Sequence, residues 1–279
     1  MTLIESLVLA ALHGFGRFVP ISSETHTRFL ERFLPFSAPD SGWKATFALG
    51  ALLALTLYFI HDWASILSSF IRVTAYRKRP MTLDERYPFF MLFCVAIPFA
   101  TLWAVFKQFD LSSFESFQEL LARWELAGLI GGTLFLFFAE RWSKKSRGPF
   151  DLGILDSIIL GIGQLASWIP GVGGTLGMLG ISQLRNYHLE AATKSTCLMS
   201  LPFIAYEAFH GLGGIQWKTS EPLPNTSWFQ WSLALFVSTV GAFIALRVLN
   251  EQIRQNGFGK LILYRALVTV AAAGLYFFG

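Results

Sequence analysis

The sequence predicts an all-α integral membrane protein with six transmembrane helices and two re-entrant helix pairs in an inverted repeat. Three observations favour this fold class: an apolar composition, six apolar runs of membrane-spanning length, and two further apolar runs that glycine and proline interrupt. Of the 279 residues, 53% are hydrophobic and 14% are charged, and the mean hydropathy is +0.50. A soluble domain carries about 25% charged residues, so the composition excludes most soluble classes, intrinsic disorder, coiled coils and disulfide-stapled scaffolds.

The charged residues and the cysteines exclude further classes. The net charge of +4 is modest and gives no support for nucleic-acid binding. Cys94 and Cys197 both lie in apolar runs, which favours two buried thiols over a disulfide or a metal site. We expect no metal ligands. We also expect no signal peptide, because the first apolar stretch has no basic segment before it and no small-residue cleavage site after it.

Six runs are long enough to cross the hydrocarbon core of a bilayer, which takes about 20 helical residues. They lie at residues 44–62, 88–106, 125–141, 193–211, 228–248 and 262–278. Lysine and arginine gather in the loops after the first and third runs, and also around the link between the last two runs, which carries Arg247, Arg254, Lys260 and Arg265. By the positive-inside rule these three regions face the cytoplasm.

Two apolar stretches remain, at residues 3–20 and 154–170, and glycine and proline break each one near its far end. Superposed on each other, they match at several positions, with Val8-Leu9 on Ile158-Ile159 and Phe18-Val19-Pro20 on Trp168-Ile169-Pro170. The match indicates a duplication. According to the charge pattern, the first copy begins outside the cell and the second begins in the cytoplasm, so the copies are inverted. Broken apolar segments at matching places in two inverted copies predict re-entrant helix pairs that build a site near the membrane midplane. The alternative is that both stretches are ordinary kinked spanning helices.

We therefore predict a single membrane domain over residues 1–279. Its inverted repeats cover roughly residues 1–106 and 154–248. A linking span covers residues 125–141, and a final span covers residues 262–278.

Two segments resemble the signatures of one protein family. Residues 17–26 read RFVPISSETH, which is similar to E-F-L-P-[IV]-S-S-T-G-H, the first signature of the bacterial undecaprenyl-diphosphate phosphatases of the bacitracin-resistance type. Residues 164–174 read QLASWIPGVGG and stand where the second signature, Q-x-x-A-x-x-P-G-x-S-R-S-G, is expected. Further anchors recur in the family's order along the chain, namely Leu49-Gly50, Leu53-Ala54, Ile97-Pro98, Ala139-Glu140, Pro202 and Tyr264-Arg265.

The resemblance implies a fold, an activity and a location. Members of this family have six spanning helices and two inverted re-entrant pairs, and they hydrolyse undecaprenyl diphosphate to undecaprenyl phosphate, which recycles the lipid carrier for cell-wall synthesis. The implied partners are a polyprenyl diphosphate lipid and the bilayer, and the implied location is the bacterial inner (cytoplasmic) membrane, crossed several times. A divalent cation (magnesium or calcium) bound with the diphosphate is left open as a cofactor, and so is a homodimer.

The signatures differ from those of the family at positions expected to perform the chemistry. The two acidic residues of the first signature correspond to His13 and Arg17, and the serine and arginine of the second correspond to Gly173 and Gly174. Whether the chain is an enzyme is therefore open at this point. The alternative is a catalytically degenerate relative that binds or translocates polyprenyl phosphate lipids without hydrolysis.

Hydrolysis of a phosphoanhydride needs positively charged side chains or aligned backbone N–H groups that bind the phosphates. It also needs an attacking group and a general acid or base. The catalytic candidates near the first signature are His26, Ser22, Ser23, Glu24 and His13. Arg17 offers a guanidinium fork to phosphate oxygens. The other candidates for substrate binding are Gln164, Gly171, Gly173, Gly174 and Thr175, and the backbone N–H groups of residues 171–174 are expected to form an anion nest.

Simpler roles are open for several of these residues. Ser22 and Ser23 follow Pro20 and have the position of helix-capping serines. His13 lies on an apolar stretch, where a packing role is common. Glu207 lies near the end of a predicted span and is interpreted as an interfacial residue.

Overall fold

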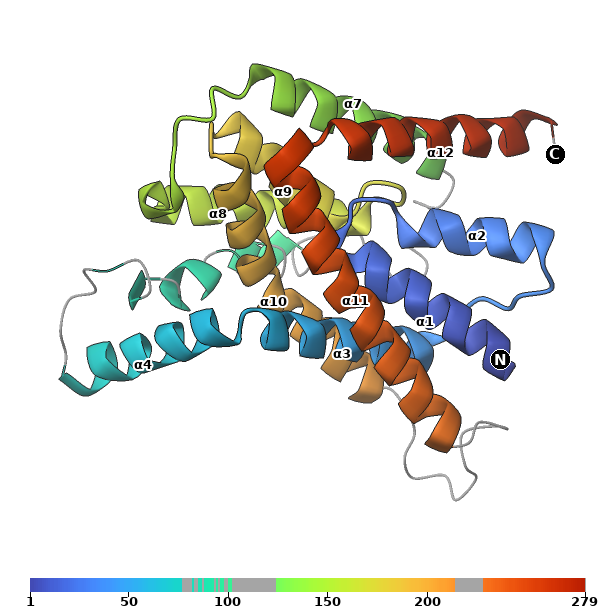
Figure 1. The fold of residues 1–279 in the computed structure, drawn as a ribbon, viewed down its shortest axis with the longest axis horizontal. Helices are drawn as coiled ribbons and strands as arrows, with labels where there is room; N and C mark the ends of the chain where they lie inside the picture. Colours follow the sequence, from blue (N-terminus) through green and yellow to red (C-terminus); the bar gives the residue numbers. More distant parts are fainter. Residues whose placement is uncertain are drawn as a thin grey trace. The chain divides into compact units, whose positions relative to one another are not determined.

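The computed structural model describes residues 1–76, 124–213 and 228–278, with shorter pieces between residues 82 and 101. In these parts the chain is helical, and its one β feature is an isolated bridge between Arg147 and Tyr187 (Figure 1). The predicted all-α class is confirmed. The chain divides into two compact units, one made of Met1–Tyr58 and Leu201–Leu249 and the other of Phe59–Ser200 and Asn250–Gly279.

The first unit contains three whole helices and parts of two others. These are α1 (Leu3–Phe18), α2 (Ser23–Phe33) and α3 (Ser41–Tyr58), with parts of α10 (Leu189–Gly213) and α11 (Trp228–Asn256). A capping box starts α1, in which Glu5 N donates to Thr2 Oγ1 over 3.3 Å and Thr2 N donates to the Glu5 carboxylate over 2.6 Å.

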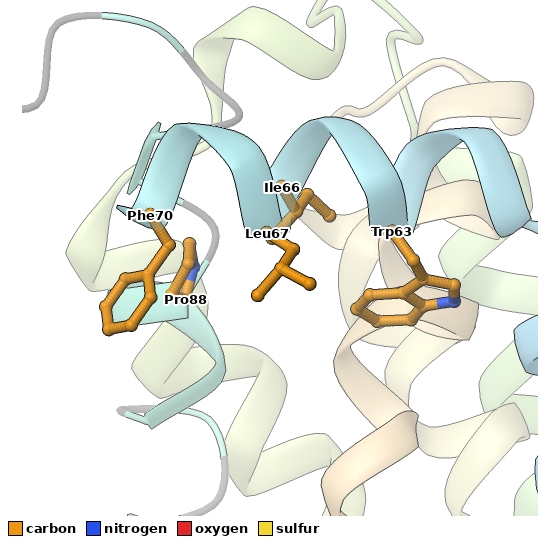
Figure 2. Close-up of a pocket in the computed structure, with 5 residues that line it drawn as sticks. All are labelled: Trp63, Ile66, Leu67, Phe70 and Pro88. Atoms are coloured by element: carbon orange, nitrogen blue, oxygen red, sulfur yellow. The ribbon is translucent and has the colours of Figure 1, made fainter. Parts of the chain in front are cut away.

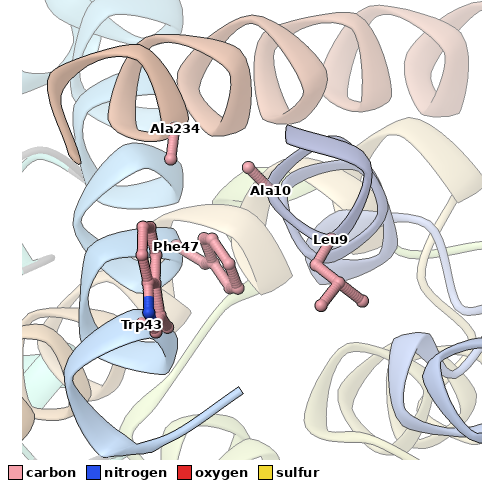
Figure 3. Packing of buried hydrophobic residues seen from close by; sticks show 5 residues of the cluster. All are labelled: Leu9, Ala10, Trp43, Phe47 and Ala234. Carbon is pink, nitrogen blue, oxygen red and sulfur yellow. The ribbon is translucent and has the colours of Figure 1, made fainter. Parts of the chain in front are cut away.

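Helices α1, α3 and α11 meet in the core of the first unit. Its buried cluster consists of Leu9, Ala10, Trp43, Phe47 and Ala234 (Figure 3). Close to this cluster, Ser238 Oγ of α11 donates a hydrogen bond of 2.9 Å to the Phe47 carbonyl of α3. Gly14 of α1 faces the Ser238 carbonyl so closely that a Cβ at this position would clash with its oxygen. Small residues thus bring these helices together, as they do in membrane proteins generally.

Among the described residues, the second unit contains five long helices in full and the remaining parts of α10 and α11. The whole helices are α4 (Ile60–Tyr76), α7 (Glu125–Trp142), α8 (Ile154–Gln164), α9 (Gly174–Leu184) and α12 (Gly259–Phe278). A short 3₁₀ turn at Leu165–Trp168 extends α8. Gly163 and Gly177 allow α8 and α9 to approach closely, because a Cβ on Gly177 would clash with the Gly163 carbonyl oxygen.

Two of the described helices are long and apolar enough to span a membrane: α11 over Trp228–Ile253 and α12 over Gly259–Tyr276. Helices α7 and α10 cover the third and fourth predicted runs, but their crossing of the bilayer stays a prediction. The second run, residues 88–106, lies largely outside the described residues. The count of six spans therefore stays a prediction.

The first predicted run, residues 44–62, is not one helix. Helix α3 ends at Tyr58 and α4 begins at Ile60, so that Asp62 lies in the first turn of α4. The two helices reach spanning length and hydropathy only when they are taken together across this break. Hydropathy did not reveal the break, because apolar side chains such as Leu57, Phe59 and Ile60 continue across it.

Both interrupted stretches contain a break between two helices, as predicted. Val19 and Ile169, the residues before Pro20 and Pro170, are extended, because the ring of a following proline disfavours the helical conformation. Helices α2 and α9 resume at Ser23 and Gly174. The inverted relation between the two copies stays a prediction.

We expect the substitution Gly14→Ala to destabilise the protein, because the new Cβ would meet the backbone oxygen of Ser238 rather than a side chain that can move aside. Overpacking of this kind costs about 1 to 3 kcal/mol. The control is Gly274→Ala, whose added methyl group would meet nothing within 4 Å. Thermal unfolding in one detergent compares the two variants, and equal midpoints would contradict the prediction.

Candidate functional site

The turn between α1 and α2 holds most of the predicted catalytic residues. Ser22 has a left-handed backbone with φ of 59°, which is strained for a residue other than glycine. Its carbonyl oxygen lies 2.9 Å from His26 Nδ1 and 3.3 Å from the His26 backbone nitrogen. Because a carbonyl only accepts, Nδ1 carries the proton. In the neutral ring the lone pair is therefore on Nε2, the nitrogen that can act as a base.

The serine side chains do not cap α2 in the expected way. The Ser22 hydroxyl lies 2.9 Å from the Thr25 hydroxyl, and it makes no capping hydrogen bond to the backbone of α2. The predicted capping role of Ser22 is therefore wrong. Ser23 begins α2 next to Gly16, where a Cβ would lie 2.8 Å from the Ser23 Cβ. The glycine lets the start of α2, and the serine with it, lie directly against α1.

His13 lies in the packing of the first three helices. Its Nε2 is 3.0 Å from Thr27 Oγ1, and its ring stacks on Phe47 with centroids 5.3 Å apart. The Thr27 hydroxyl donates to the Ser23 carbonyl over 3.0 Å, so Nε2 of His13 is the donor to Thr27. This geometry favours the packing role of His13. Glu24 is exposed in the first turn of α2, where the helix dipole favours a negative charge.

Arg17, in the last turn of α1, forms an ion pair with Glu207 of α10 through Nη2 and Oε2. The two side chains are 27% and 34% exposed. The interpretation of Glu207 as an interfacial residue missed this contact. One signal was available: an arginine in an otherwise apolar helix usually has a partner, although the sequence did not show which carboxylate reaches it.

In the second unit, the loop between the 3₁₀ turn and α9 contains two glycines with positive φ, Gly171 and Gly173, both at 84°. The N–H groups of Val172 and Gly173 donate to the carbonyls of Ile169 and Ala166, over 3.1 Å in each case. These bonds contradict the predicted anion nest over residues 171–174. For an anion the loop leaves the start of α9, which begins at Gly174 and is followed by Thr175, because the helix dipole favours a negative charge at a helix N-terminus.

Two buried polar atoms lie beside this helix start. Gln164 is 5% exposed, and a Cβ on Gly174 would lie 2.7 Å from its Nε2 and 3.2 Å from the Ser167 Cβ. Within the described parts of the chain, neither Gln164 Oε1 nor Ser167 Oγ has a hydrogen-bond partner. Buried polar atoms normally have partners, so these two groups point to a bound polar species at this position.

Arg265 holds the same loop from α12. It is 1% exposed and donates from Nη2 to the Gly171 carbonyl over 2.7 Å and from Nε to Thr133 Oγ1 over 3.3 Å. Gly132 of α7 leaves room for the guanidinium, because a Cβ there would lie 3.0 Å from Nη2. The use of Arg265 as a marker of a cytoplasmic loop was therefore wrong, since its charge is buried among helices.

The start of α8 is fixed by a charged cluster. Arg147 donates to both carboxylate oxygens of Asp156 over 3.0 and 2.9 Å, and Arg185 Nε donates to Oδ1 over 2.7 Å. Burial alone would raise the pKa of Asp156, but the hydrogen bonds from both arginines outweigh it and hold this pKa below its ordinary value. The carboxylate is therefore charged at neutral pH, and the cluster joins the loop before α8 to the end of α9.

An apolar hollow of about 310 Å³ lies along α4. It is lined by Trp63, Ile66, Leu67, Phe70 and Pro88, and Pro88 lies beside Phe70 (Figure 2). None of these residues is ionisable, so the hollow does not provide groups for a diphosphate. Among the described residues, no group of three or more histidine, cysteine, aspartate or glutamate side chains is arranged to hold a metal ion.

The model of the family described as bacitracin resistance protein BacA matches residues 6–271. The chain belongs to this family. Curated relatives include the undecaprenyl-diphosphatases of Moorella thermoacetica and Geotalea daltonii, each 27% identical to it. The alignments cover 99% of this chain and 98% of the first relative, and 100% of both chains for the second. An undecaprenyl-diphosphatase of Anaeromyxobacter sp. (strain Fw109-5) is also 27% identical, over 100% of this chain and 90% of the relative.

The structure gives two of the BacA-family anchors a physical role. Glu140 at the end of α7 accepts a hydrogen bond of 3.0 Å from the backbone nitrogen of Phe258, just before α12. Gly257 has φ of 64° and approaches the same carboxylate. Arg265, seven residues after Phe258, donates to the Gly171 carbonyl and so holds this loop. Both anchors therefore join α12 to the elements that position this loop.

We expect Arg265→Ala to lower the stability of the protein by roughly 3 kcal/mol, because the Gly171 carbonyl and the Thr133 hydroxyl lose their buried donor and a cavity remains. The matched control is Lys260→Ala on the exposed surface of the same helix, which should change stability by less than about 0.5 kcal/mol. Thermal unfolding in detergent measures both effects. An Arg265→Ala protein as stable as the control would show that the two hydrogen bonds of Arg265 contribute nothing to stability.

Proposed function

We propose that this protein is an integral membrane phosphatase that hydrolyses undecaprenyl diphosphate to undecaprenyl phosphate. The observation that carries the proposal is the fixed orientation of His26 by the Ser22 carbonyl, at a turn that also bears Arg17 and Ser23. The printed names of the curated relatives supply the substrate class. The protein works in the bacterial inner membrane and recycles the carrier lipid for cell-wall synthesis.

The proposed topology has six spans and two re-entrant pairs in an inverted repeat within a single membrane domain. Helix breaks at Val19 and Ile169 support it, because broken helices at matching places of two repeats are typical of membrane proteins with a site at mid-depth. Backbone groups released by such breaks must be satisfied by protein or by a water-filled cavity. The bonds from Arg265 to Gly171 and from His26 to Ser22 satisfy two of these carbonyls.

In the proposed reaction, the guanidinium of Arg17 binds the terminal phosphate and neutralises part of its charge. His26 Nε2 takes a proton from the attacking group, a water molecule or the Ser23 hydroxyl, as that group attacks the terminal phosphorus. The bond between this phosphorus and the bridging oxygen breaks, and undecaprenyl phosphate leaves with the bridging oxygen. If Ser23 attacks, a water molecule then releases the phosphate from the serine. Glu24 is the candidate for further proton transfer.

The start of α9 is proposed as a phosphate-binding element in its own right. Gly173 and Gly174 leave it without a side-chain cap, and Thr175 follows in its first turn. A Cβ on Gly173 would meet nothing within 4 Å, so this position faces open space. Gln164 and Ser167 offer the unpartnered polar atoms described above. Gly171 contributes through its positive φ and its carbonyl bond to Arg265.

The test is phosphate release from undecaprenyl diphosphate by the purified protein in detergent. We expect turnover by the wild-type protein and a loss of about 10² to 10⁴-fold in rate for His26→Ala, the usual size of a general-base effect. The control is His188→Ala, which changes an exposed histidine of the second unit and should leave the rate unchanged. Retention of the lipid diphosphate without phosphate release would overturn the proposal and would favour the non-hydrolytic binder.

A further inference from the structure

The ion pair between Arg17 and Glu207 is an unusual feature of the first unit. Both side chains are only about one-third exposed or less, and each belongs to a helix that is otherwise mostly apolar. A charged group at membrane depth is costly unless it is paired or faces a cavity, and such groups usually mark functional sites. The pair therefore requires an explanation beyond helix packing.

The backbone on the Arg17 side of the pair is firmly held. His13, one turn earlier on the same face of α1, is fixed by its bond to Thr27 and its stack on Phe47. Gly14 is in close contact with Ser238 of α11. The flexible part is thus the long arginine side chain itself, which has many rotamers and binds phosphate well only when its fork is pre-oriented.

The Glu207 side is also anchored. The neighbouring residues Phe203, Ile204 and Ala208 are buried, at 5%, 1% and 0% exposure. One turn after Glu207, Gly211 packs against Ala45 of α3, where a Cβ would lie 2.7 Å from the Ala45 Cβ. The carboxylate therefore projects from a part of α10 that is fixed on α3, and it reaches the guanidinium at the end of α1.

We propose that Glu207 is a positioning residue that holds the Arg17 guanidinium in the orientation that binds the terminal phosphate. The contact joins Oε2 of the carboxylate to Nη2 of the guanidinium, and a guanidinium presents its N–H donors in a planar fork that suits phosphate oxygens. Glu207 thus restrains the position of Nη2 and balances the partly exposed charge of Arg17. This inference rests on the proposed binding of a lipid diphosphate by Arg17.

The test compares Glu207→Gln, Glu207→Asp and a matched control, Glu190→Gln, which changes an exposed glutamate of the same helix. We expect Glu207→Gln to raise KM for undecaprenyl diphosphate roughly tenfold, the effect of losing one charge-assisted hydrogen bond. Glu207→Asp should recover part of this loss, and the control should match the wild type. A lower KM for Glu207→Gln would overturn the proposal, because it would show that the carboxylate competes with phosphate for Arg17.

A purely structural role makes a different prediction for coupled variants. If Glu207 acts through Arg17, the double variant Arg17→Ala/Glu207→Ala should bind the lipid no more weakly than Arg17→Ala alone. Additive losses, or a lower unfolding midpoint with unchanged KM, would contradict the positioning role.

Equilibrium binding of undecaprenyl diphosphate distinguishes a failure of this inference from a failure of the proposed reaction. If the wild type binds the lipid without releasing phosphate, the proposed hydrolysis is wrong, and the binding constants of the variants still test Glu207. Absence of binding would overturn both.

Discussion

A positive charge among apolar helices needs a polar or charged partner. The described residues contain three arginine contacts that meet this need. Arg17 pairs with a carboxylate, Glu207. Arg265 is satisfied by a backbone carbonyl and a hydroxyl, and Arg147 shares Asp156 with Arg185. For the two buried groups, Arg265 and Asp156, removing a partner leaves an uncompensated charge in a low-dielectric environment, which is more costly than losing an apolar contact. Each pairing therefore fixes the chain segment to which it is bonded.

Small residues allow the helices that carry these paired groups to approach one another. Gly14 and Gly16 let α1 approach α11 and the start of α2, while Gly132 leaves space for the guanidinium of Arg265. The Ser22 carbonyl and the His26 ring, by contrast, meet through the local geometry at the start of α2, four residues apart. Glycine positions thus allow the helix contacts, and at Gly132 they allow the contact of Arg265 with the Gly171 loop.

Much of the fold followed from sequence alone, for physical reasons. Long apolar runs marked α11 and α12, and the prolines at 20 and 170 marked the breaks, because proline constrains the residue before it. The break at Phe59 was not predictable, since no proline or charge marks it and its neighbours are apolar. Helices α3 and α4 also belong to different compact units, a division that hydropathy along the chain does not show.

The site was predicted less completely than the fold. His26 and Ser22 were found through their signature, and their mutual bond is local, four residues apart. The contacts of Glu207 and Arg265 were not predicted, because Glu207 is 190 residues from Arg17 and Arg265 is 94 residues from Gly171 (207 − 17 and 265 − 171). A single sequence shows that a buried arginine needs a partner, but it does not show which distant residue provides one. The predicted nest over residues 171–174 failed similarly, since the loop uses the Val172 and Gly173 N–H groups for its own turns.

The central claim is that the guanidinium fork of Arg17 binds the diphosphate. Its most direct measurement is the equilibrium binding of a lipid diphosphate in which a methylene group replaces the bridging oxygen, so that no hydrolysis interferes. Arg17→Lys keeps the positive charge and removes the fork. We expect the dissociation constant to rise roughly tenfold in this variant, the equivalent of one charge-assisted hydrogen bond. An unchanged dissociation constant would contradict the claim.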